Sequence, residues 1–276
     1  MRQRKWIRGR RPWTKEQYRK GIFIVPSLFT VSNVWCGFFS VSSAIKGNLE
    51  LAAILIGIAM ILDTLDGRMA RLTHTTSEFG VQLDSLADAI TFGMAPAVLC
   101  YLWAFYNFEN LSIDRAGWLV SFLFLICAAS RLARFNVQTA AVSDKRYFVG
   151  MPTPAAAGVV ASTVFCFPDR LNGDASAIAV LLGMGILAFL MISRIKYRSF
   201  KDLNLKQPRS YRFVVLIALI IVGIALDPKH MLITLAAVYA FSGLIGNFWA
   251  RRRKPAPAPA ADRPPVATLA ADETKN

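Results

Sequence analysis

The feature that most constrains the fold is a succession of long apolar segments. A helix that crosses a bilayer needs about 20 mostly apolar residues. Candidate spans of roughly this kind, the fifth and seventh of them short, cover residues 23–45, 49–71, 82–105, 118–135, 153–167, 175–195, 213–226 and 231–249. The chain is 55% hydrophobic and only 18% charged, whereas soluble domains carry about 25% charged residues. We therefore expect an all-α fold, a polytopic membrane bundle of about eight helices.

Basic residues are distributed unevenly among the connections. If the N-terminus is cytosolic, 28 of the 32 Lys and Arg residues fall on the cytosolic side. The exceptions are Lys46, Arg115, Arg170 and Lys229. This is the bias of the positive-inside rule, and it predicts that both termini are cytosolic. The formal charge of +15 then lies mostly beside the membrane, where it suits anionic lipid head groups better than nucleic acid.

The two ends of the chain differ in composition from the apolar middle. Residues 1–20 interleave aromatic and basic side chains, which predicts a segment lying on the membrane interface; a disordered basic tail is the alternative. Residues 21–252 form the expected transmembrane domain. Residues 253–276 are rich in Pro and Ala and are expected to be a disordered tail. The four cysteines lie in apolar runs without a CxxC pair, which indicates packed thiols.

Four aspartates interrupt the second and third apolar segments. An ionisable residue inside a span costs about 2.5–3.5 kcal/mol on insertion scales, so each is a candidate for function. Asp63 and Asp66 are three residues apart, and Asp84 and Asp88 are four apart. Both spacings place a pair on one face of a helix. Because a turn near residues 74–77 joins the two helices, all four carboxylates are expected to meet at one depth, near the cytosolic surface.

Carboxylates packed this closely repel one another unless they are protonated or neutralised. The nearby cations, Arg68 and Arg71, are too few to pair all four. A divalent cation is the simple solution, and all-oxygen ligation indicates Mg²⁺ or Mn²⁺. Since Mg²⁺ commonly bridges carboxylates and phosphates, the ligand is expected to be a phosphate ester. Gly67 and Gly80 would allow the helices, or a diphosphate, to approach the backbone. The alternative is that the aspartates simply reach water at helix ends.

These residues resemble the signature of the CDP-alcohol phosphotransferase family, D-x2-D-G-x2-A-R-x8-G-x3-D-x3-D. Every fixed position is matched, by Asp63, Asp66, Gly67, Ala70, Arg71, Gly80, Asp84 and Asp88. The resemblance implies a membrane enzyme that moves a substituted phosphate from a CDP-linked donor to an alcohol and releases CMP. It also implies that the first three aspartates hold the metal. The fourth, Asp88, would lie in the metal site and act as the general base.

Within the family, the chain looks most like the branch that transfers a phosphatidyl group from CDP-diacylglycerol to L-serine. The supporting segments are IFIVPSLFTVSNVWCGFFS, SRLARFNV and FVGMPTPAAAG. The resemblance implies CDP-diacylglycerol and L-serine as substrates, a homodimer, and a bacterial-type inner membrane with the active site facing the cytosol. Glycerol 3-phosphate and inositol are the rival acceptors. A divalent-cation transporter is the rival class, although transporter sites usually lie near the bilayer midplane.

Further polar residues are candidates for substrate binding in such an enzyme. Those assigned to CDP-diacylglycerol are Thr30, Asn33, Gly67, Arg71, Ser77 and Gly80. Thr30 and Asn33 could instead form hydrogen bonds between helices, and Arg71 could be ordinary cytosolic charge. Either Arg131 or Arg134 is expected to bind the acceptor carboxylate or the lipid phosphate, with simple snorkelling to the interface as the alternative.

Overall fold

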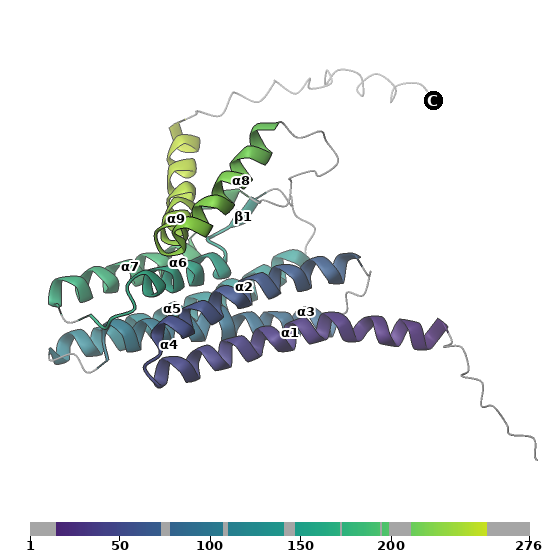
Figure 1. The fold of residues 1–276 in the computed structure, drawn as a ribbon, viewed down its shortest axis with the longest axis horizontal. Helices are drawn as coiled ribbons and strands as arrows, with labels where there is room; N and C mark the ends of the chain where they lie inside the picture. The colour runs from purple at the N-terminus through teal and green to yellow at the C-terminus, as the bar shows by residue number, and fades with distance from the viewer. Residues whose placement is uncertain are drawn as a thin grey trace, which may run out of the picture.

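The computed structural model describes residues 15–72, 78–106, 110–140, 147–171, 173–193, 195–198 and 211–252. The described part is a long helical bundle, and its last two helices project steeply from one side of it (Figure 1). Its helices are α1 (Lys15–Ile45), α2 (Leu49–Leu72), α3 (Glu78–Asp88), α4 (Ala95–Ala104), α5 (Leu111–Ala140), α6 (Thr153–Cys166), α7 (Asp174–Ile192), α8 (Tyr211–Leu226) and α9 (Pro228–Arg252). A π-helical turn, η1 (Ala89–Met94), joins α3 to α4.

Helices α1 and α2 pack side by side. Ala52, Ile56 and Ala59 recur at helical spacing on α2 and are completely buried. Small side chains let two helix backbones approach closely, which is the usual basis of helix packing in membranes. A buried hydroxyl fastens the pair, since Ser40 Oγ donates a hydrogen bond to the carbonyl oxygen of Ala52 at 2.8 Å. The α1–α2 pair therefore has a fixed relative position.

Helix α3, η1 and α4 form one nearly continuous rod over residues 78–104. The predicted span 82–105 thus contains a π-helical turn that the sequence pattern did not reveal. Pro96 stands in the first turn of α4, where its missing N–H costs least. The turn packs tightly against α1, because a Cβ built on Gly37 would lie 2.6 Å from Thr91 Oγ1. π-Helical turns inside α-helices frequently occur at functional sites.

A short antiparallel ribbon joins the segment before α6 to the segment after α7. Strand β1 (Tyr147–Val149) pairs with β2 (Lys196–Arg198). The N–H of Gly150 donates to the carbonyl oxygen of Ile195 at 2.8 Å, and the N–H of Met151 donates to that of Leu190 at 3.0 Å. Gly150 has φ +87°, a left-handed conformation that favours glycine. The all-α prediction holds for the bundle, and the ribbon is a small addition in segments that carry no helical pattern.

Apolar side chains cover much of the outside of the bundle. Leu182, Ile186 and Phe189 of α7, for example, are more than half exposed. Water would not favour such a surface, whereas lipid chains match it. Among the described residues, four segments are long and apolar enough to cross a membrane: Leu28–Ile45, Glu78–Ala104, Leu111–Val137 and Asp174–Ile192. The chain is therefore an integral membrane protein; the count of eight spans and the cytosolic termini remain predictions.

Candidate active site

Three carboxylates meet between α2 and α3, at positions inside both helices and not at the residues next to their connection. Asp63 of α2 and Asp84 and Asp88 of α3 each offer an oxygen atom, and these three oxygens all lie within 4.8 Å of one another. The three residues are half-buried. The spacing of four residues keeps Asp84 and Asp88 on one face of α3. Three of the four aspartates that the sequence predicts to meet are thus in the cluster.

The cluster is electrostatically unfavourable without a cation. At an effective dielectric constant of about 20, two full negative charges 4.8 Å apart repel by about 3 kcal/mol. Within the described residues, Asp88 Oδ1 is buried and has no hydrogen-bond partner. A buried polar atom without a partner is costly unless something else satisfies it. The orphaned oxygen and the all-carboxylate donor set both fit a hard divalent cation such as Mg²⁺ or Mn²⁺.

Asp66, the fourth aspartate, lies beside this group of three without being part of it. Its side chain is 7% exposed, and its negative charge acts on both Asp84 and Asp88. Thr30 Oγ1 of α1 donates a hydrogen bond to Asp66 Oδ2 at 2.5 Å. Thr30 therefore forms a hydrogen bond between helices, and its partner is the Asp66 carboxylate next to the cluster.

Arg131 of α5 supplies positive charge next to the cluster. It is 9% exposed and lies close enough to Asp88 for electrostatic attraction. Its Nη1 donates to Thr153 Oγ1 at 3.0 Å, and its guanidinium carbon lies 5.8 Å from the centroid of the Phe135 ring. Tyr239 of α9 is also within electrostatic reach of this guanidinium. Arg131 is therefore held in place rather than extended towards an interface.

Arg134, one turn further along α5, has a different partner. Its Nη1 donates to the carbonyl oxygen of Ile192 at 3.1 Å. Ile192 is the last residue of α7, where carbonyl groups have no partner within the helix. Arg134 therefore ties α5 to the end of α7, and the two candidate arginines are not equivalent.

Two residues that the sequence did not single out as site residues join α3 to α5. Asn136 Nδ2 donates to Ser85 Oγ at 2.9 Å, and Ser85 directly follows Asp84. The available signal for Asn136 was its place in SRLARFNV, just beyond the two candidate arginines. Ser85 gave no signal, because a serine in a helix commonly bonds to its own backbone.

The remaining candidates for donor binding differ in how far they are buried. Asn33 is 1% exposed, and its Oδ1 has no hydrogen-bond partner among the described residues. Gly67 is exposed, and a Cβ built there would meet nothing within 4 Å, so close helix packing does not require this glycine. Gly80 is half-buried. The Arg71 side chain and Ser77 lie outside the described residues.

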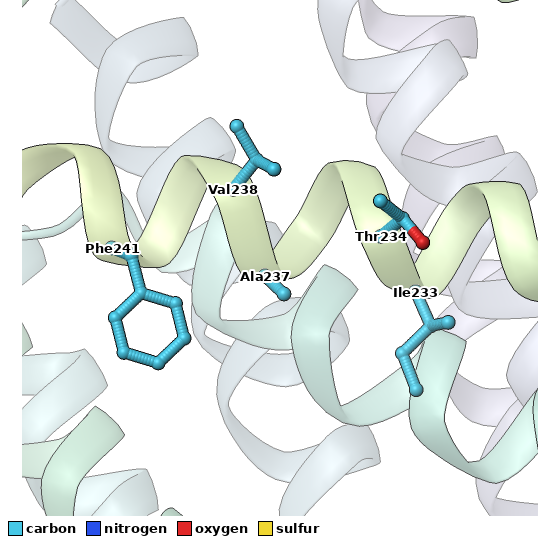
Figure 2. Close-up of a pocket in the computed structure, with 5 residues that line it drawn as sticks. All are labelled: Ile233, Thr234, Ala237, Val238 and Phe241. Carbon is cyan, nitrogen blue, oxygen red and sulfur yellow. The ribbon is translucent and has the colours of Figure 1, made fainter.

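A groove of about 420 Å³ lies elsewhere, along α9. Figure 2 shows its lining side chains projecting from that single helix, namely Ile233, Thr234, Ala237, Val238 and Phe241. The one hydroxyl in this set donates to its own helix, from Thr234 Oγ1 to the carbonyl oxygen of His230 at 2.7 Å. The groove offers no charged group for a diphosphate, so the carboxylate cluster is the better candidate site.

Apolar spans that carry this carboxylate cluster define an integral membrane protein able to hold a divalent cation. The chain belongs to the CDP-alcohol phosphatidyltransferase family, whose model matches residues 23–195. The resemblance noted from the aspartate signature is thereby confirmed.

Several relatives of the chain carry the same enzyme name. The chain is 36% identical over 225 residues to a CDP-diacylglycerol–serine O-phosphatidyltransferase of Helicobacter pylori strain J99, covering 81% of this chain and 91% of the relative. It is 34% identical over 225 residues to the enzyme of the same name from Methanocaldococcus jannaschii, covering 81% and 97%. A Bacillus subtilis relative of that name is 32% identical over 177 residues, covering 64% and 91%.

Proposed function

We propose that the chain catalyses phosphatidyl transfer from CDP-diacylglycerol to L-serine, giving phosphatidylserine and CMP. The observation that carries the proposal is the carboxylate cluster of Asp63, Asp84 and Asp88, built from the residues that match the family signature. Relatives bearing the serine transferase name span bacteria and an archaeon, which favours serine over other acceptors. Because the chain belongs to a family of phosphatidyltransferases, a transferase is favoured over a divalent-cation transporter.

The four aspartates would together hold Mg²⁺ or Mn²⁺. Asp63, Asp84 and Asp88 already offer converging oxygens, and Asp66 is adjacent. A bound divalent cation would offset the negative charge of the diphosphate and polarise the phosphorus. The protein's own contribution is to present carboxylates at fixed positions, which lowers the reorganisation needed for reaction.

Asp88 is the proposed general base. Its Oδ1 is buried without a hydrogen-bond partner among the described residues. Because a carboxylate has about four acceptor sites, Asp88 could contact the cation and still accept a proton from an alcohol placed beside it. The serine hydroxyl oxygen would form a bond to the phosphorus that carries the diacylglycerol. The bond from that phosphorus to the bridging oxygen would break, and CMP would leave with the bonding electrons.

Arg131 is the proposed partner of the serine carboxylate. A guanidinium carries five N–H donors in a planar fork, and the described bond to Thr153 uses one nitrogen. The remaining edge suits a carboxylate, which can accept two parallel hydrogen bonds. Since Arg131 is already ordered, little side-chain entropy would be lost on binding. Arg134 would support this arrangement through its bond to α7.

The donor would lie on the α1–α3 side of the cluster. We assign the nucleotide and diphosphate to Asn33, Gly67, Arg71, Ser77 and Gly80, with the lipid tails remaining in the bilayer. The excess of basic residues beside the predicted cytosolic ends favours an active site on the cytosolic face of a bacterial inner membrane. A homodimer is expected from family membership.

Release of CMP from CDP-diacylglycerol by the purified protein tests this function. L-Serine, glycerol 3-phosphate and inositol are supplied separately with Mn²⁺ or Mg²⁺. We expect serine to give the highest kcat/KM. Faster turnover with either rival would overturn the serine assignment, and no CMP release with any alcohol would overturn the transferase assignment itself.

A further inference from the structure

Thr30 of α1 donates a hydrogen bond to a carboxylate of α2 that lies next to the carboxylate cluster. It is 6% exposed and lies on α1, 36 positions before its partner Asp66 on α2. Its hydroxyl donates to Asp66 Oδ2 at 2.5 Å. A carboxylate has two oxygens with about four acceptor sites, so this bond leaves Oδ1 available for another ligand.

The contact is well suited to fix an orientation. Threonine is branched at Cβ and has few χ1 rotamers in a helix, and its backbone is held by the close packing of α1 on α2. An aspartate, by contrast, has a broad χ2 distribution. Asp66 is also pushed by the like charges of Asp84 and Asp88, which would favour its turning away. The hydrogen bond from Thr30 to Asp66 Oδ2 opposes that movement.

We propose that Thr30 is a positioning residue that orients the Asp66 carboxylate towards the cation site. The inference rests on the proposed function, because it takes Asp66 as one of the metal ligands. Thr30 acts here through Asp66 rather than by touching the nucleotide. Residues that hydrogen-bond to metal ligands commonly change metal affinity about 10- to 100-fold when they are removed.

The chain offers a matched control for a purely structural effect. Ser40 also lies on α1, is completely buried, and donates across to α2, at the carbonyl oxygen of Ala52. Its partner is a backbone carbonyl and not one of the four aspartates. Ser40→Ala therefore removes a buried α1–α2 hydrogen bond while leaving the cluster's own partners intact.

The test measures Mn²⁺ binding by electron paramagnetic resonance on the purified full chain without substrates. We expect Thr30→Val, which keeps the shape and removes the donor, to raise the Kd for Mn²⁺ about 10- to 100-fold. Thr30→Ser restores the hydroxyl and should bind within about 3-fold of wild type. Ser40→Ala should bind as wild type does. If Thr30→Val is not recovered folded, Thr30→Ala gives the same comparison.

Any of the following results would overturn the positioning role of Thr30. Wild-type affinity in Thr30→Val, or tighter binding, would overturn the positioning role, as would equal weakening in Ser40→Ala. Failure of Thr30→Ser to restore affinity would do the same. A wild-type chain that binds no Mn²⁺ would overturn the proposed metal site as well, so the two failures are distinguishable.

Discussion

Replacing Arg131 separates acceptor binding from the rest of the reaction. If its guanidinium binds the serine carboxylate, Arg131→Ala removes a charge-assisted hydrogen bond worth about 1.5–3 kcal/mol. That loss corresponds to roughly a 10- to 150-fold weaker affinity for serine. We therefore expect the KM for serine to rise by such a factor, while the KM for CDP-diacylglycerol changes by less than about 3-fold.

The structure also indicates a cost in stability that the assay must separate from binding. Arg131 is buried beside Asp88 and bonded to Thr153. Removing one partner of a buried charge interaction can destabilise a protein by about 3–5 kcal/mol. Arg131→Lys keeps the charge but lacks the planar fork, so it should remain better folded and still show a raised KM for serine.

Arg134→Ala is the matched control, since it removes an arginine one turn away on the same helix. Its described bond goes to the backbone of Ile192, so we expect a lower thermal midpoint and a KM for serine within about 3-fold of wild type. The assay is steady-state CMP release with serine and CDP-diacylglycerol varied in turn. An unchanged serine KM in both Arg131 variants would refute the assignment, and so would a larger effect from Arg134→Ala.

Three further predictions address the metal, the topology and the packing. Asp84→Asn should abolish CMP release and weaken Mn²⁺ binding without lowering the thermal midpoint, because it removes a charge from a repelling cluster; retained turnover would contradict the role of this carboxylate. Ser199→Cys, introduced on a background lacking the four native cysteines, should resist an impermeant thiol reagent applied to intact cells. Labelling from outside would contradict the eight-span model. Gly37→Ala should destabilise the bundle by about 1–3 kcal/mol, because the added Cβ would lie 2.9 Å from Thr91 Cα; an unchanged thermal midpoint would show that α1 and η1 can separate.

The meeting of Asp63, Asp84 and Asp88 was predictable from the sequence for a simple reason. Helical periodicity fixes which residues share a face. Two consecutive antiparallel helices also place residues at similar distances from their connection side by side, and Asp63 lies nine residues before the end of α2 while Asp84 and Asp88 lie six and ten residues after the start of α3. The same periodicity could not place Thr30 against Asp66, because that contact depends on how α1 is rotated about its axis relative to α2. Such rotations are set by the packing of many side chains at once.

Other parts of the fold lacked a local signal. The π-helical turn after Asp88 continues an apolar helix and leaves the composition of the segment unchanged. The ribbon of β1 and β2 uses three residues from each strand, too few to give an alternating pattern. The difference between Arg131 and Arg134 was also hidden, since two arginines one turn apart look alike until their partners, Thr153 and the Ile192 carbonyl, are known.

The central claim is that the aspartate cluster holds a divalent cation on which phosphatidyl transfer to serine depends. The most direct measurement is mass spectrometry of the lipid that the purified protein makes from CDP-diacylglycerol and L-serine, before and after the protein is stripped of metal with EDTA. The account predicts phosphatidylserine with Mn²⁺ or Mg²⁺ present, none after stripping, and recovery when either cation is restored. Undiminished formation of phosphatidylserine in excess EDTA would contradict it.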